Sequence, residues 1–156
     1  MQPIIQAEHV SFSYGEQAIL KDINLTINPG EIIGLIGKNG AGKTTLLNLL
    51  LGVRVKKSGH LTLFDQVPGG PLAKQNIGSM LQGDLPIRGI TVVELLTMAA
   101  THYPTALQPK QLMADLALTE LSQRQLTTLS GGQLRRVTFA LALIGNPKLL
   151  FLDEPT

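Results

Sequence analysis

Apolar and polar residues alternate with a period of two over short stretches of the first half of the chain, a pattern typical of half-buried strands. The turn pair Pro29-Gly30 closes one of these stretches. Residues 31–36 differ, because they form a nearly continuous apolar run, as in a strand buried on both faces. This patterning predicts strands at residues 10–14, 23–28, 31–36, 61–64 and 77–82.

Helical spacing of apolar residues dominates the second half of the chain. An earlier helix is predicted to begin near Gly42 and to stop at Gly52, a residue suited to the position after a helix end. A buried strand at residues 148–153 follows the last helix and ends in an acid. Three further helices are predicted at residues 91–103, 110–121 and 133–144. The layout is strand-rich, then helical, then returns to a core strand.

Composition narrows the classes of function. The 156 residues fit one domain with a real core. Thirteen basic against eleven acidic side chains give a net charge of +2, too weak a field to indicate nucleic acid or an anionic membrane as a partner. The absence of cysteine excludes disulfides and thiolate chemistry. The N-terminus does not resemble a signal peptide, and the apolar stretches at residues 46–53 and 137–145 fall short of the roughly 20 residues that span a bilayer. A membrane role therefore requires a partner.

A glycine-rich loop between a predicted strand and a predicted helix matches the phosphate-binding pattern G-x-x-x-x-G-K-[ST] in full. Glycines let successive backbone N–H groups turn toward phosphate oxygens, and the helix N-terminus adds its positive end. Lys43 brings a charge to the β- and γ-phosphates and so serves catalysis, and the Thr44 hydroxyl is a ligand for Mg²⁺. The alternative is a glycine-rich turn that only caps a helix. The predicted nucleotide-binding residues of this segment are Gly37, Lys38, Asn39, Gly40, Ala41, Gly42, Lys43, Thr44 and Thr45.

Two carboxylates, Asp153 and Glu154, follow the last predicted strand. Ligands of open α/β sheets lie beyond the carboxyl ends of the strands, so this acid pair is expected to face the phosphate loop. Asp153 is predicted to hold Mg²⁺, and Glu154 to polarise the water that attacks the γ-phosphate. Taken alone, an Asp-Glu pair at a strand end is more often a solvated turn. The complete loop upstream favours the catalytic interpretation.

A second glycine-rich helix start precedes the helix at residues 133–144. It is a potential second phosphate site, although Ser130 also fits a purely local role as the helix N-cap. One ATP does not need two such cradles from one chain, so we expect this surface to contact the nucleotide of another subunit. The segment consists of Leu129, Ser130, Gly131, Gly132 and Gln133.

This five-residue segment is the signature sequence of ATP-binding cassette (ABC) proteins, and essentially the whole chain resembles that family in motif order. The resemblance implies that Tyr14 stacks on adenine, although Tyr14 also fits a strand aromatic. It implies that Gln82 contacts Mg²⁺ and relays the state of the nucleotide, with a catalytic role. It further implies an α/β fold: a P-loop NTPase core with a mostly parallel sheet flanked by helices, an N-terminal antiparallel β part and an inserted α-helical subdomain. The expected core comprises residues 1–82 and 146–156, and the helical subdomain residues 83–145.

The sequence departs from the family pattern in a few places. Leu134 follows the signature where many relatives carry a polar residue, which we interpret as variation on a helix surface. Arg135-Arg136 fits a solvated or core-edge pair better than a nucleic-acid site. The sequence stops at Thr156, where family members continue to the D-loop and the switch histidine, and none of His9, His60 and His102 replaces that histidine. We therefore expect a truncated cassette that binds ATP less tightly than its full-length parent and hydrolyses it poorly or not at all.

The resemblance implies a Mg²⁺-dependent ATPase that powers an ABC transporter from the cytoplasmic face of the membrane. Its expected partners are a second ATPase subunit, arranged head-to-tail as a homodimer or heterodimer, and an integral membrane permease. Residues 139–156 resemble bacterial multidrug or ABC-2-type exporters, so export is expected. The alternative is a soluble ABC-type ATPase that acts on ribosomes or DNA. The compact segment between Lys43 and Ser130 has no heptads, unlike the coiled coils of DNA-repair relatives. The transported substrate does not follow from the sequence.

Overall fold

The computed structural model describes residues 2–80 and 87–153. The chain divides into two compact units, residues 1–74 and 75–156, and each is described by itself. The short helix α2 (Pro71–Asn76) spans the junction.

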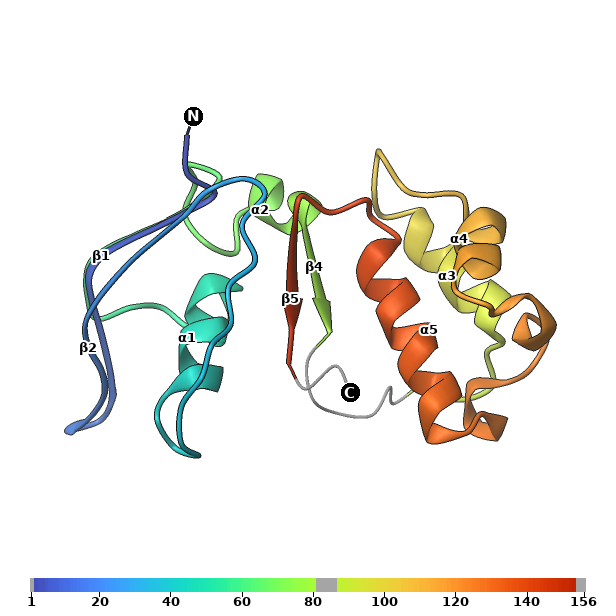
Figure 1. The fold of residues 1–156 in the computed structure, drawn as a ribbon, viewed down its shortest axis with the longest axis horizontal. Coiled ribbons are helices and arrows are strands. Elements are labelled where there is room, and N and C mark those ends of the chain that lie inside the picture. The colour runs from blue at the N-terminus through green and yellow to red at the C-terminus, as the bar shows by residue number, and fades with distance from the viewer. Residues whose placement is uncertain (1, 81–86, 154–156) are drawn as a thin grey trace. The chain divides into compact units, whose positions relative to one another are not determined.

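The first unit is built on a three-stranded antiparallel sheet with the order β2-β1-β3. Its strands are β1 (Ile5–Tyr14), β2 (Gln17–Ile27) and β3 (Ser58–Leu63). Helix α1 (Lys43–Leu50) lies beside β2 and buries three leucines, which extend the core formed by the buried residues of the sheet (Figure 1). The strands predicted at residues 10–14, 23–28 and 61–64 are confirmed, as is the helix that begins at Gly42.

The predicted buried strand at residues 31–36 is wrong. The structure assigns this segment to neither a helix nor a strand, and Ile32 and Ile36 are 98% and 95% exposed. A strand requires backbone partners on a neighbouring strand. In the described part of the chain the three strands of the first sheet pair with one another and leave this segment without a ladder. An apolar run indicates that burial would be favourable, but it does not supply the partner.

The second unit contains a parallel pair of strands, β4 (Ile77–Met80) and β5 (Leu149–Leu152). Ile77 pairs with Leu149 and Met80 with Leu152, so the carboxyl ends of both strands lie at the same edge. Helix α5 (Gly131–Leu143) packs on β4, as Figure 1 shows. The strands predicted at residues 77–82 and 148–153 are confirmed over their described residues.

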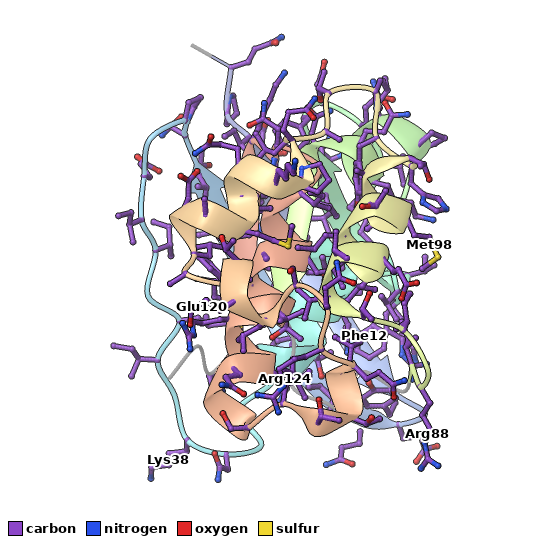
Figure 2. The ribbon with its side chains drawn as sticks, turned by 90° about the vertical axis from the view of Figure 1, so that its right-hand side faces the viewer. Phe12, Lys38, Arg88, Met98, Glu120 and Arg124 are labelled. Carbon is purple, nitrogen blue, oxygen red and sulfur yellow. The ribbon has the colours of Figure 1, made fainter. Side chains whose placement is uncertain are left out.

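The other elements in the described residues of the second unit are helices and helical turns. The unit contains α3 (Val92–Ala100) and α4 (Pro109–Asp115), followed by the 3₁₀ turns η1 (Thr119–Leu121) and η2 (Leu126–Thr128). Their apolar side chains form one cluster with those of α5. Met98 is an exception, since it projects from α3 into solvent (Figure 2). Leu134, which we expected on a helix surface, is partly buried against this cluster.

The helix predicted at residues 110–121 is too long, because α4 ends at Asp115. Ala117 adopts a left-handed backbone conformation with φ of 53°. The Leu118 N–H then reaches back to the Met113 carbonyl at 2.8 Å, which closes the helix end with the bonding pattern of a Schellman motif. This turn lets Leu118 enter the apolar cluster, and its burial outweighs continuation of the helix.

Candidate functional site

The phosphate loop at residues 37–44 folds as a bend that leads directly into α1. Gly40 and Gly42 have φ of 81° and 92°, a left-handed region that favours glycine. Gly42 has a second requirement, since a Cβ there would lie 2.8 Å from Leu20 Cδ2 and 3.3 Å from the Ile19 carbonyl oxygen. The pattern glycine is therefore needed both for the turn and for the close approach of the loop to β2.

Lys43 is held by the loop itself. Its Nζ donates to the carbonyl oxygens of Gly37 at 2.6 Å and Lys38 at 3.0 Å. These bonds place the ammonium group on the inner side of the bend, where it can also reach a phosphate oxygen. Lys38 instead lies at the outer end of the bend and points into solvent (Figure 2). The two lysines of the loop thus have different surroundings, and only the ammonium group of Lys43 is bonded to the carbonyls of the loop in the described structure.

The N-terminus of α1 has no side-chain partner. Its N-cap residue, Gly42, makes no side-chain capping bond, and the first turn carries no acidic residue. Backbone N–H groups at a helix start need acceptors, and the helix dipole favours an anion there. Thr44 is exposed, so its hydroxyl is accessible to a metal ion, whereas the side chain of Thr45 is buried. The loop, the lysine and the helix start together present a cation and backbone N–H groups of the kind that can bind a polyphosphate.

Tyr14 is linked to the phosphate loop through contacts within the first unit. Gly42 packs on Leu20 of β2, and Leu20 pairs with Phe12 of β1. The Phe12 ring then meets the Tyr14 ring edge-to-face, with centroids 5.0 Å apart. Tyr14 is 45% exposed, which leaves part of its ring accessible to a stacking partner. Its position is consistent with an adenine contact, and that role is a proposal.

Two cations that sequence reasoning missed lie beside Tyr14. Arg54 Cζ is 5.5 Å from the centroid of the Tyr14 ring, and Lys57 Nζ donates to the carbonyl of the next residue, Gly15, at 3.0 Å. Both lie about 40 positions further along the chain. Only the pairing of β1 with β3 brings them here, with Ser11 opposite Ser58. No local pattern in the sequence indicates this proximity.

Asp153 follows β5 in the second unit. Its backbone N–H donates to the Met80 carbonyl at 2.9 Å, which extends the parallel pairing by one residue, and its side chain is half-buried. Asp153 therefore stands at the carboxyl edge of a parallel pair, the usual ligand edge of α/β sheets. Gln82 and Glu154 lie outside the described residues, so their roles remain predictions.

The signature segment forms the start of α5. Ser130 is the N-cap: its Oγ accepts from the Gln133 N–H at 3.3 Å, and its own N–H donates to Gln133 Oε1 at 3.0 Å. This capping box confirms the local role of Ser130. A Cβ on Gly131 or Gly132 would meet nothing within 4 Å, so the glycines present open backbone to solvent. Leu129 is partly buried against the helical cluster and anchors the segment.

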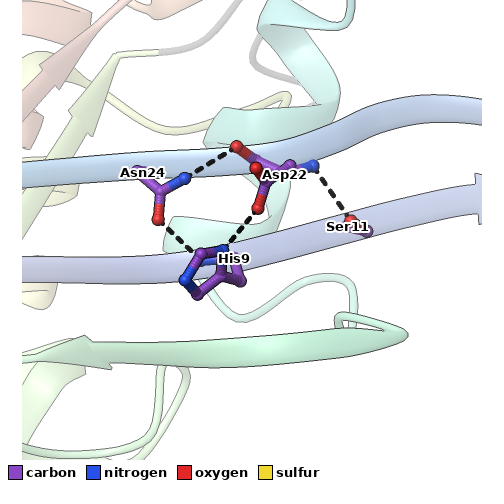
Figure 3. A network of polar contacts seen from close by, with 4 residues as sticks. All are labelled: His9, Ser11, Asp22 and Asn24. Atoms are coloured by element: carbon purple, nitrogen blue, oxygen red, sulfur yellow. Dashed lines mark hydrogen bonds and ion pairs between the residues drawn. The ribbon is translucent and has the colours of Figure 1, made fainter.

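A separate polar network occupies the middle of the β1–β2 hairpin (Figure 3). His9 Nδ1 lies 2.6 Å from Asp22 Oδ1, and the His9 N–H donates to Asn24 Oδ1 at 2.9 Å. The hydrogen bond from His9 lowers the pKa of the Asp22 carboxyl. The pKa of Glu31 is lowered by the Asn28 N–H, and that of Glu94 by the Thr91 N–H. These three exposed carboxylates lie outside the loop and stabilise turns, bulges and caps.

No group of three or more histidine, cysteine or acidic residues that could hold a metal ion occurs among the described residues. Mg²⁺ is commonly held by one or two protein oxygens together with substrate phosphates. The exposed Thr44 hydroxyl of the first unit and the Asp153 carboxylate of the second are each an oxygen group of that kind, so each residue type by itself fits Mg²⁺. In the described part of the chain, no helix has the length and apolarity needed to cross a bilayer.

The loop, the free helix start and the parallel strand pair define the class of protein: a P-loop nucleotide-binding protein. Comparison with known proteins then identifies the family, because the profile of the family described as "ABC transporter" matches residues 20–156. The chain belongs to the ABC transporter family, among its ATP-binding subunits.

Individual relatives agree with this assignment. The chain is 40% identical over 154 residues to the zinc import ATP-binding protein ZnuC of Psychrobacter cryohalolentis, covering 97% of this chain and 60% of that protein. It is 37% identical over 160 residues to the Nod factor export ATP-binding protein I of Cupriavidus pinatubonensis, covering 98% of this chain and 49% of that protein. A solved structure of the ATP-binding subunit of an ABC transporter matches with a TM-score of 0.87 at 23% identity, covering 97% of this chain and 66% of that one, and supports the fold. The chain thus spans about half to three fifths of the length of these two sequence relatives.

Proposed function

We propose that this chain binds MgATP and forms the nucleotide-binding part of an ATP-hydrolysing motor subunit of an ABC transporter. The observation that carries the proposal is the phosphate loop at residues 37–44, with Lys43 on its inner side and an uncapped helix start behind it. Membership of the ABC transporter family supports ATP as the nucleotide.

Each part of the proposed site has a defined task. Lys43 and the N–H groups at the start of α1 bind the β- and γ-phosphates, and Tyr14 stacks on adenine. Thr44, Asp153 and Gln82 would hold Mg²⁺, which neutralises charge on the phosphates when bound. Glu154 accepts a proton from the attacking water and orients that water in line with the bond to be broken. These roles stabilise charge and position the reactants, which is most of what phosphoryl transfer requires of a protein.

The signature segment is proposed to complete the site of a second ATPase subunit. Its open glycines and the N-terminus of α5 are suited to an anion. The phosphates of the ATP that this chain binds are, in this proposal, already contacted by its phosphate loop, so the anion at α5 belongs to the ATP of the other subunit. Head-to-tail pairing would place each loop opposite the partner's signature segment. Closure of such a dimer around ATP is a nucleotide-dependent switch that a membrane permease can follow. We place the subunit at the cytoplasmic face of the membrane, held there by that permease.

Export is the proposed direction of transport, supported by the resemblance of residues 139–156 to exporters. The named relatives include both a zinc importer and a Nod factor exporter, so the family alone favours neither direction. Both are named as transporter components, which supports transport over an action on ribosomes or DNA. A permease co-purified with this protein and reconstituted in vesicles provides the test. With the ATPase subunit on the outer face of the vesicle, that face corresponds to the cytoplasm. If the direction is export, ATP added outside must drive accumulation of the transported substrate inside the vesicle.

Replacement of Glu154 by glutamine tests the catalytic assignment. Glu154→Gln is expected to retain MgATP binding, to lose hydrolysis by roughly 100-fold or more and to favour an ATP-bound dimer, since general-base catalysis contributes about that much. Steady-state phosphate release and size-exclusion chromatography with ATP measure these effects. Glu120→Gln, an equivalent change on the exposed turn η1, is the control. Normal turnover by Glu154→Gln would show that Glu154 is not the base.

A further inference from the structure

The ring of Tyr14 is fixed from two sides by its neighbours. Phe12 approaches it edge-to-face at 88° between the ring planes, with centroids 5.0 Å apart. The guanidinium carbon of Arg54 lies 5.5 Å from the ring centroid, within the range of a cation–π contact. Arg54 itself is exposed, and its neighbours Val53 and Val55 are exposed as well. Folding of the core therefore does not require the Arg54 side chain at this place.

The segment that carries Arg54 is attached to the turn that carries Tyr14. The Lys57 N–H donates to the Ser11 carbonyl at 3.0 Å, and Lys57 Nζ donates to the Gly15 carbonyl at 3.0 Å. Tyr14 pairs with Gln17 at the end of the hairpin, and the intervening turn is exposed. Such a turn has few contacts of its own to hold an aromatic ring. The 54–57 segment supplies contacts to both the turn backbone and the ring.

We propose that Arg54 is a positioning residue for the nucleotide base: it stacks on one face of Tyr14 and holds the ring so that its other face receives adenine. The inference rests on the proposed function, in which Tyr14 contacts the base. A ring that is already held loses less conformational freedom when a ligand stacks on it, so the conformational entropy lost on binding is smaller. Arg suits this place because its planar guanidinium stacks on aromatic rings.

Two other roles for Arg54 predict different results. If the guanidinium contacted the phosphates, its loss would weaken every polyphosphate ligand, with or without a base. If it occupied the ring face that adenine needs, its loss would strengthen ATP binding. Of these three roles, positioning is the one that weakens ATP while leaving a ligand without a base unaffected.

The experiment compares dissociation constants of MgATP and of magnesium tripolyphosphate, measured by isothermal titration calorimetry, for the wild-type protein and its variants. Arg54→Ala is expected to weaken MgATP binding roughly two- to five-fold, the range of an exposed cation–π contact, and to leave tripolyphosphate binding unchanged. Arg54→Lys, which keeps a cation, is expected to recover part of the loss. Lys56→Ala removes the same charge from the same segment and is the matched control, with no change expected. Circular dichroism melts verify that each variant folds.

Unchanged or tighter MgATP binding by Arg54→Ala would overturn the inference, as would an equal loss for both ligands or an equal loss in Lys56→Ala. Failure of the proposed function is distinguishable, because it shows in the wild-type protein as absence of MgATP binding before any variant is compared. That outcome also removes the role of Arg54.

Discussion

Left-handed backbone at two non-glycine residues shapes the middle of the β1–β2 hairpin. His9 and Asp22 have φ of 51° and 52°, and the pairing register of the strands shifts between Ala7 and Val10. Such conformations strain most side chains, although Asn, Asp and His adopt them more readily than others. The hydrogen bonds among His9, Ser11, Asp22 and Asn24 offset that strain (Figure 3). The bulge is thus encoded by a few polar residues.

The lowered pKa of Asp22 predicts a pH-dependent contribution to stability. Because the folded pKa lies below the ordinary value of 3.8, the contribution is fully present above that value and is lost as the pH falls through the folded pKa. Asp22→Asn keeps the shape and tolerates the backbone, so it should lower the free energy of unfolding at pH 7 more than at pH 3. Urea denaturation at both pH values measures this. Asp65→Asn, at another exposed aspartate with positive φ, is the control. An equal loss at both pH values would contradict the account.

At the scale of elements, the contact between β4 and α5 depends on Gly78. A Cβ at this position would lie 2.0 Å from the Ala142 carbonyl oxygen and 2.9 Å from Leu150 Cδ1. The carbonyl belongs to the helix backbone and cannot turn aside as a flexible side chain would. Glycine at position 78 therefore sets how closely the helix approaches the strand.

Gly78→Ala is expected to lower the free energy of unfolding by roughly 1–3 kcal/mol, because the helix must move away from the strand. Chemical denaturation followed by circular dichroism measures the change. Ser79→Ala, at the exposed neighbouring position in β4, should change stability little. Equal stabilities of Gly78→Ala and the wild-type protein would show that this contact is looser than the structure indicates.

The elements that the sequence predicted well are those with local signals. The capping residues Thr91 and Ser130 mark the starts of α3 and α5, and alternation marks β1 and β2. The failures involve distant parts of the chain. Residues 31–36 are apolar but lack a strand partner in the described structure, and α4 ends early because burial of Leu118 requires a turn at Ala117.

The candidate site likewise contains parts with local sequence signals and parts that depend on contacts between distant segments of the chain. The phosphate loop is contiguous in sequence, and the structure shows its local geometry, with Gly42 at φ of 92° and the Lys43 ammonium group bonded to the loop carbonyls, whereas the binding roles of these residues stay predictions. The contacts of Leu20 with Gly42 and of Arg54 with Tyr14 join residues that are far apart in the sequence and depend on how the strands pair. The spacing of residues along the chain does not predict such contacts. Local motifs therefore indicate which chemistry to expect, whereas the groups that position the motifs become visible only in the fold.

At the scale of the whole molecule, the first unit carries the phosphate loop, and the second carries the signature segment and Asp153, all within a chain of the ABC transporter family. Every proposed task, from hydrolysis to coupling with a permease, depends on nucleotide binding at the loop. Lys43 is the side chain that this binding requires most directly, since its ammonium group is already held on the inner side of the bend.

The most direct test is the dissociation constant of MgATP for the wild-type protein and for Lys43→Ala, measured by isothermal titration calorimetry. Loss of a charged hydrogen bond of about 1.5–3 kcal/mol predicts that Lys43→Ala binds MgATP roughly 10- to 150-fold more weakly. Lys21→Ala, on the exposed part of β2, removes an equal charge and should bind like the wild-type protein. Saturable binding by the wild-type protein that Lys43→Ala loses is the predicted result. Equal affinity in both proteins, or no binding by either, would contradict the assignment of the loop as the ATP site.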